Sequence, residues 1–385
     1  MCFRAIPVSI TFLFTMALCA EELTPRPSAT ERIAARTFPS IFQAWNRADN
    51  LQSEDTWTTL ARHDLVFHAP DFFGLNWADK YPGISTSFTT DSQASAIGTR
   101  KKLLSKNPHL VMLAELRYRD AHQSYLPENH AWWKRKDGQR VIGWEEGGYF
   151  LLDFSNPAYR TQIAQQAKRI IDTGVFDGIM LDWWEDDEDR LKLVQAIRRE
   201  IGDKALILVN ANDRKTPETA AFINGYFMEC YQSKTPEDWK KIAETLRWAE
   251  SNLQAPRINC VETWFQKSRA DLHLMRATTT LSLTLSDGYC LFSDPNPLPA
   301  PDHLHDWYDF WNKSLGRPKA KGVQNQDGSI QREFDQGFAV YNPPGNRPVT
   351  ITFTTPHTAV SSRTSGLTFT VPPADGDLFL KVSSN

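Results

Sequence analysis

The fold is read most directly from FDGIMLDWWE at residues 176–185. An apolar run there ends abruptly in an acid, Asp182, followed by two tryptophans. Near-continuous apolar runs are typical of parallel strands, because helices cover both of their faces. In barrels of such strands the functional side chains stand at the carboxyl ends, which is the position of Asp182.

The same rhythm of apolar run, polar loop and amphipathic stretch recurs between residues 38 and 294, with helical patterns at 157–171, 187–201 and 236–251. We predict eight strands: Ser40–Trp45, Asp64–Ala69, Leu110–Leu116, Phe176–Trp183, Leu206–Asn210, Gly225–Tyr231, Arg257–Trp264 and Gly288–Phe292. Strands alternating with helices indicate a parallel sheet. Eight of them predict an α/β fold of the (β/α)8 TIM barrel type.

Both ends of the chain differ from this rhythm. Residues 1–20 hold one Arg, a short apolar core and small residues at the end, which is typical of a signal peptide. We therefore expect an exported protein, periplasmic or extracellular, with no membrane contact after cleavage. The barrel is assigned to 21–316.

A linker at 317–329 is expected to lead to a small antiparallel β-sandwich over 330–385, packed on the barrel. Its predicted strands are Phe338–Tyr341, Val349–Phe353, Leu367–Val371 and Leu378–Val382.

A long insertion, residues 117–160, separates the third and fourth predicted strands. It carries Trp132, Trp133 and Trp144 and is longer than an ordinary connection. A substrate-binding loop, a disordered segment and a structural flap are all consistent with this pattern.

Composition excludes some classes of function. The net charge of -3 argues against a nucleic-acid partner, because a polyphosphate needs a basic face. Cleavage of the signal peptide would leave Cys230, Cys260 and Cys290, an odd number that favours buried thiols over a disulfide framework. The sequence carries no signal of oligomeric state.

Motifs for other chemistries are missing from the sequence. It has no glycine-rich phosphate loop, no His-Glu-x-x-His helix and no Gly-x-Ser-x-Gly elbow, so we expect no cofactor and no metal. His303-Leu-His305 is similar to the paired histidines of metal-dependent barrel hydrolases, but it follows the eighth strand and is interpreted as a loop feature.

Three acids end predicted strands four, six and seven: Asp182, Glu229 and Glu262. Cleavage of a glycosidic bond needs two carboxyl groups, one that donates a proton and one that attacks the sugar or activates water. These acids are the candidate catalytic residues, although each has a structural alternative as a helix cap or an arginine partner. Asp177, at the start of strand four, is interpreted as structural.

Other side chains at the same strand ends are candidates for binding sugar. Polar candidates would hold hydroxyl groups or orient the carboxylates, and aromatic ones would stack on sugar rings. They are Arg117, Asn210, Asn212, Asp294, Trp183, Trp184, Tyr231 and Trp264.

The segment 176–184 resembles the fourth-strand motif of several barrel glycosidase families. The chain is similar to hypothetical glycosyl hydrolase family 15, and more distantly to the endo-α-1,4-polygalactosaminidase-like family. The motifs that carry this resemblance, spread over roughly residues 38–345, are VNAN at 209–212, NGYFME at 224–229, LDFSNP at 152–157, REFDQG at 332–337 and YNP at 341–343.

The resemblance implies that Asp182 is the nucleophile or base and that Glu229 is the proton donor. A different barrel clan has its nucleophile on strand seven, which keeps Glu262 in reserve. The sequence thus predicts a glycoside hydrolase acting on a poly- or oligosaccharide. The alternative from another class is a non-catalytic exported glycan-binding protein. A metal-dependent barrel hydrolase would need three or more clustered ligands, which the sequence does not offer.

Overall fold

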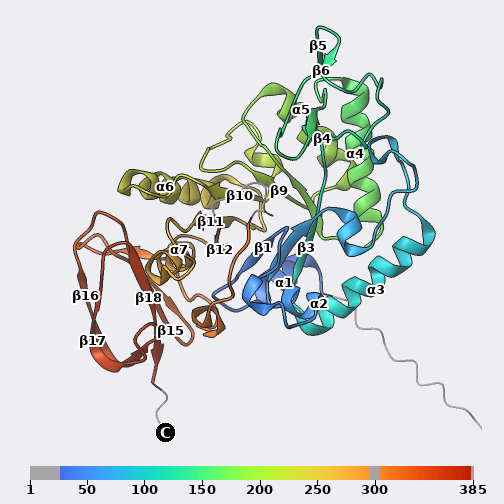
Figure 1. Cartoon of the computed structure of the whole chain (residues 1–385). Helices are drawn as coiled ribbons and strands as arrows, with labels where there is room; N and C mark the ends of the chain where they lie inside the picture. The colour runs from blue at the N-terminus through green and yellow to red at the C-terminus, as the bar shows by residue number, and fades with distance from the viewer. Residues whose placement is uncertain (1–26, 295–302, 383–385) are drawn as a thin grey trace, which may run out of the picture.

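The computed structural model describes residues 27–294 and 303–382, so the predicted signal peptide lies outside the described residues. Eight parallel strands form one sheet, which confirms the predicted barrel (Figure 1). In sheet order they are β1 (Phe42–Ala44), β2 (Leu65–His68), β3 (Val111–Glu115), β8 (Gly178–Leu181), β9 (Leu206–Asn210), β10 (Gly225–Cys230), β11 (Cys260–Trp264) and β12 (Tyr289–Ser293). The barrel closes where the Cys290 N–H donates to the Ser40 carbonyl at 3.0 Å.

Every residue of β3, β8 and β9 is buried, as expected for strands covered on both faces. Alternate side chains point to opposite sides of the sheet. Phe67, Met180 and Phe227 belong to a cluster inside the barrel. Ile179 and Val209 join a second cluster with apolar side chains of the surrounding helices. Two apolar layers therefore hold the strands in place.

The helices begin where the sequence offers caps. They are α1 (Ala29–Ala35), α2 (Thr56–Leu60), α3 (Thr90–Lys106), α4 (Pro157–Asp172), α5 (Glu188–Ile201), α6 (Pro236–Asn252) and α7 (Leu272–Leu285). The Asn156 side chain accepts the Ala158 N–H at 2.9 Å, with Pro157 as the first residue of α4. Asp187 accepts the Arg190 N–H at 2.9 Å, which puts Glu188 in the first turn of α5, where the helix dipole favours acids.

The insertion between β3 and α4 is built from short strands. β4 (Asp120–His122) pairs with β7 (Tyr149–Leu151), and β5 (Arg135–Lys136) pairs with β6 (Gln139–Arg140). It stands at the top of the view in Figure 1, beside α4 and α5. The insertion is thus an ordered wall next to the carboxyl end of β3.

The C-terminal region forms one antiparallel sheet that encloses a small core of its own, including Val340, Phe353 and Phe379. Its strands are β13 (Val323–Gln324), β14 (Ile330–Phe334), β15 (Gly337–Asn342), β16 (Val349–Ala359), β17 (Ser365–Val371) and β18 (Asp375–Lys381). The four predicted strands match β15 to β18. The predicted linker, 317–329, is wrong in part, because it contains β13 and because Pro318 bridges Phe334.

This C-terminal sheet docks on α7 through charge as well as shape. Asp375 accepts bonds from the Arg276 guanidinium at 2.8 and 2.7 Å, and Arg332 donates to the Ser286 carbonyl at 2.6 Å. A Cβ at Gly376 would lie 1.9 Å from Thr280 Oγ1, so only glycine allows this approach of β18 to the helix. The sheet buries one side of α7 while the barrel buries the other.

Cys230, Cys260 and Cys290 are free and buried, as predicted. Within the described ranges, no helix combines the length and the apolar character needed to cross a bilayer.

Asp177 stands at the amino end of β8 and is structural, as its position predicts. Its carboxylate pairs with Arg32 of α1 at 2.5 Å and with Arg100 of α3 at 2.6 Å. It also accepts the Met112 N–H at 2.9 Å. One buried acid therefore ties two helices to two barrel strands.

Asp177→Ala is expected to lower the free energy of unfolding by about 3 kcal/mol, because two buried guanidinium groups lose their counter-ion. Urea denaturation measures this loss. The matched control is Asp172→Ala, which breaks an exposed ion pair with Lys168 and should cost less than about 1 kcal/mol. Equal losses in the two variants would contradict the buried role of Asp177.

Candidate active site

A cavity of about 300 Å³ opens at the carboxyl ends of the barrel strands. Its walls come from the ends of β1, β2, β3, β8 and β10, from the insertion, and from the loop after β12. Side chains that line it include Trp45, His68, Glu115, Arg117, Trp144, Tyr149, Asp182, Trp183, Glu229 and His303. Four of the predicted site residues, Arg117, Asp182, Trp183 and Glu229, thus lie in one cavity.

Asn210 joins the two best catalytic candidates. Its Nδ2 donates to Asp182 Oδ1 and to Glu229 Oε2, both at 2.8 Å. Its Oδ1 accepts the Asn212 N–H at 3.2 Å, which fixes the amide with its nitrogen toward the acids. Because one nitrogen holds both carboxylates, the two bonded oxygens are at most twice 2.8 Å apart.

Burial and like charge raise the pKa of both acids. The pKa of Asp182 rises to about 6, through burial and the nearby Glu115, while Arg117 and Asn210 act to lower it. The pKa of Glu229 rises to about 7, mainly through burial, with His303 opposing and Glu262 and Asp182 adding to the rise. Glu229 therefore keeps its proton to a higher pH than Asp182 does.

Trp183 follows Asp182 in a conformation that a bulky residue rarely adopts, with φ of +56°. Its carbonyl accepts bonds from Tyr118 Oη at 2.7 Å and from the Arg190 guanidinium at 2.8 Å, which hold this turn in place. The indole is 45% exposed and the Arg119 guanidinium lies over it, 4.3 Å from the ring centroid. The strained turn lifts an aromatic face to the rim of the cavity.

Glu115 is a cavity acid that the sequence prediction left out of the site. It accepts a bond from Trp45 Nε1 at 2.9 Å and forms an ion pair with Arg117 at 2.9 Å. Arg117 in turn stacks on Tyr149, with 4.8 Å between the guanidinium and the ring centroid. Glu115 thereby fixes the cation that moderates the charge of Asp182.

Glu262 does not reach this cavity. It is fully buried, and the His303 Nδ1 lies 2.9 and 3.0 Å from its two oxygens. The Ser293 hydroxyl donates to the same carboxylate. The expectation of a catalytic Glu262 is corrected to a buried partner of His303, the residue that lines the cavity in its place.

Three predicted binding residues also stand apart from the cavity. Trp184 is buried and its Nε1 donates to Thr219 Oγ1 at 3.1 Å, so it is not a stacking wall. Asp294 is buried in a bidentate pair with Arg269, with both contacts at 2.8 Å. Asn212 lies behind Glu229, whose carbonyl accepts its Nδ2 at 3.1 Å, and it positions the site without lining it.

Tyr231 follows β10 and Trp264 ends β11, at the carboxyl ends of these strands, and neither side chain lines the cavity. Their ring centroids are 6.1 Å apart, and Tyr231 is 49% exposed. They form an aromatic rim next to Glu229, consistent with the predicted position at the strand ends.

The residues that the prediction missed come mostly from loops and inner strand ends. Trp45 and His68 end β1 and β2, where the rule that located Asp182 also applies. Burial lowers the pKa of His68 to about 4, so its ring is neutral in the range where the acids titrate. His303 carried a signal, the His-x-His pattern, but that pattern does not predict its contact with Glu262, which lies 41 positions earlier in the chain.

No group of three or more His, Cys, Asp or Glu side chains is arranged to hold a metal ion within residues 27–294 and 303–382. No protein-family model matches the chain, and no curated protein matches it.

Three solved structures with a similar fold are α-amylases. An α-amylase from Malbranchea cinnamomea is 9% identical with a TM-score of 0.54, covering 92% of this chain and 98% of its own. The maltogenic α-amylase AmyB from Thermotoga neapolitana is 9% identical with a TM-score of 0.53, covering 89% and 99%. An α-amylase from Lactobacillus plantarum is 8% identical with a TM-score of 0.54, covering 89% and 99%. This similarity shows the barrel with its C-terminal β domain, and the narrower resemblance stated above stays a prediction.

Glu229→Gln is expected to stabilise the protein at pH 8. Since burial raises the folded-state pKa to about 7, the folded state binds the proton more tightly than the unfolded state does. The wild type therefore loses stability as the pH rises from the unfolded pKa toward 7, and the glutamine escapes this loss. We expect a gain on the order of 2 kcal/mol at pH 8 that shrinks toward zero near pH 4.

Thermal unfolding of both proteins at pH 4 and pH 8 measures this gain, with Glu244→Gln on the exposed face of α6 as the control. A gain of the same size at both pH values would show that the charge of Glu229 is not its cause.

Proposed function

We propose that this protein is a retaining glycoside hydrolase that cleaves an O-glycosidic bond of a poly- or oligosaccharide without a cofactor. The observation that carries the proposal is the Asn210 amide, which holds the carboxylates of Asp182 and Glu229 side by side in an open cavity. Retaining glycosidases have their two carboxyl groups about 5–5.5 Å apart, whereas inverting ones need about 6.5–9.5 Å for a water molecule. Two bonds of 2.8 Å to one nitrogen fit the shorter spacing.

The order of the two pKa values supports one distribution of the two roles. Glu229, with its pKa near 7, donates a proton to the leaving oxygen, and Asp182, with its pKa near 6, attacks the anomeric carbon. The glycosyl–Asp182 ester is then hydrolysed by a water whose proton passes to Glu229, so both carboxyl groups return to their starting state. Arg117 favours the ionised form of Asp182 before attack.

The choice of substrates to test follows from the fold and from the motifs. The similar structures are α-amylases, so starch and malto-oligosaccharides are the first polymers to test. The resemblance to the polygalactosaminidase-like family adds an α-1,4-galactosaminan. Trp183 at the cavity rim, and Tyr231 with Trp264 beside it, supply the aromatic faces on which a sugar ring stacks.

Asp182→Asn and Glu229→Gln are each expected to lower kcat about 10³-fold on a substrate from this panel, because each removes one of the two reacting groups. Asp186→Asn, an exposed acid of the same loop, is the matched control and should keep wild-type turnover. Wild-type turnover in both site variants would overturn the assignment. Binding of glycan without turnover, unchanged in both variants, would identify a glycan-binding protein instead.

The stereochemistry gives a separate test. Proton NMR of the first product should show the anomeric configuration of the substrate retained. Azide added to Asp182→Gly should restore cleavage and yield a glycosyl azide of inverted configuration, since azide enters from the side that the carboxylate leaves vacant. An inverted product from the wild type would replace the nucleophile role of Asp182 with that of a base.

A further inference from the structure

A second cavity of about 410 Å³ adjoins the catalytic one. The two share Ala69, Glu115, Arg117 and Tyr149 as lining residues, so they are neighbours that meet at these side chains. We call the second one the Trp77 cavity, after the tryptophan in its wall. It is not explained by the catalytic pair, because neither Asp182 nor Glu229 lines it.

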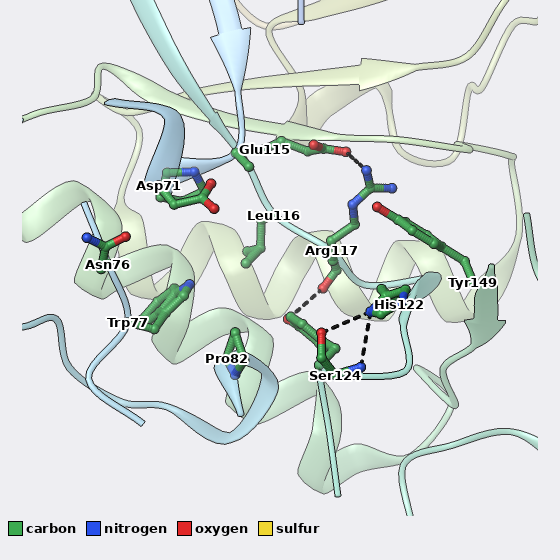
Figure 2. Close-up of a pocket in the computed structure, with 14 residues that line it drawn as sticks. Asp71, Asn76, Trp77, Pro82, Glu115, Leu116, Arg117, His122, Ser124 and Tyr149 are labelled. Carbon is green, nitrogen blue, oxygen red and sulfur yellow. Dashed lines mark hydrogen bonds and ion pairs between the residues drawn. The ribbon is translucent and has the colours of Figure 1, made fainter. Parts of the chain in front are cut away.

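The Trp77 cavity combines an aromatic face with hydrogen-bonding groups. Figure 2 shows Asp71, Asn76 and Trp77 on one wall, facing His122 and Tyr149 of the insertion. The indole of Trp77 stacks on Phe88 with 4.0 Å between ring centroids, which holds the ring in place from behind. A flat apolar ring beside amide, carboxylate and imidazole groups suits a sugar, which has an apolar C–H face and a polar rim.

The charges in the Trp77 cavity favour an uncharged sugar. Arg117 is engaged by Glu115 in the ion pair of 2.9 Å. The Asp71 carboxylate accepts the Phe72 N–H at 3.0 Å and lines the cavity. A sugar acid bound here would face Asp71 and Glu115, and like charges in a partly buried site repel.

The aromatic rim of Tyr231 and Trp264 lies on the opposite side of the barrel mouth. In the closed sheet of eight strands, β10 is four strands from β2, and β11 is four strands from β3. The Trp77 cavity stands at the ends of β2 and β3, and the aromatic rim at the ends of β10 and β11. A line across the mouth therefore runs from the Trp77 cavity past Asp182 and Glu229 to the rim.

We propose that the substrate is an uncharged polysaccharide bound along this line and cut at internal bonds, with its non-reducing part in the Trp77 cavity and its reducing part over Tyr231 and Trp264. The direction rests on the proposed function. The proton donor stands beside the leaving oxygen, so the leaving, reducing-end part lies on the side of Glu229. The retained part lies on the side of Asp182 and Glu115, toward Trp77.

The test uses neutral oligosaccharides of the maltose, cellobiose and galactose series, labelled at the reducing end and ranging from disaccharide to octasaccharide. For the series that the wild type cleaves, Trp77→Ala should lower kcat/KM on the octasaccharide about tenfold and leave the disaccharide unchanged. It should also move the cut toward the non-reducing end, which lengthens the labelled product. Trp264→Ala should move the cut the other way and shorten that product.

Trp77→Phe retains an aromatic face and should restore the wild-type pattern, which separates loss of stacking from loss of folding. Ile142→Ala, an exposed residue of the insertion outside both cavities, is the matched control. An unchanged pattern in Trp77→Ala, or shifts of both alanine variants in the same direction, would overturn the proposed binding line.

Calorimetric titration with the octasaccharides keeps this test separate from the catalytic one. The wild type could bind the octasaccharide without cleaving it. If Trp77→Ala and Trp264→Ala both lose that binding, the result would support the binding line and overturn the proposed hydrolase activity. Absence of binding to all three series, or tighter binding of an oligouronate of the same length, would overturn the uncharged substrate.

Discussion

The amide nitrogen of Asn210 is the group on which the geometry of the site depends. Its two hydrogens satisfy an oxygen of Asp182 and an oxygen of Glu229, and these bonds to charged groups are stronger than neutral ones. The arrangement requires the amide to stand on the strand between the two acids, which the sheet order β8-β9-β10 provides. Without this donor, the two half-buried carboxylates would repel each other, with no shared hydrogen bond to offset the repulsion. The order of three barrel strands thereby sets the distance between the two carboxyl groups.

Around this core the backbone is strained in a limited number of places. Trp45, Trp183, Asn212 and His303 all have positive φ and all stand at the mouth of the barrel. Each such residue costs free energy that the surrounding packing must offset, by roughly 1–3 kcal/mol. At Trp183, hydrogen bonds from Tyr118 and Arg190 to the backbone carbonyl help to offset this free energy. The strain is concentrated where side chains must leave the regular alternation of a strand to line a cavity.

The sequence predicted those parts of the molecule that follow from periodicity. Eight buried runs gave the barrel, and the end of each run located Asp182, Glu229 and Asn210, because in a parallel barrel the end of a strand is a fixed place. The prediction failed for Trp184, since it treated both tryptophans that follow Asp182 as aromatic walls of the site. The positive φ of Trp183 instead turns the next side chain into the apolar layer beneath the helices.

Glu262 shows a different limit. It ends its strand as Glu229 does, but a histidine from the loop after β12 covers it. No local pattern reports a contact between residues 41 positions apart. The walls of the two cavities share this limit, because Trp77 lies in a loop and Tyr149 in a three-residue strand of the insertion, where neither apolar period nor cap marks the position of a side chain. Sequence reasoning therefore located the acids and missed most of what surrounds them.

The two ends of β8 show why the barrel tolerates such a site. At the amino end, Asp177 is matched by two arginines and a backbone N–H, so its buried charge is well compensated. At the carboxyl end, Asp182 has one nearby arginine, Arg117, which it shares with Glu115, and burial raises its pKa. An aspartate at the amino end of this strand is thus well compensated by cations, whereas the aspartate at its carboxyl end is not. The barrel tolerates this poorly compensated carboxylate because apolar layers on both faces of the sheet hold the strand, and an acid whose pKa is raised by burial is a candidate for catalysis.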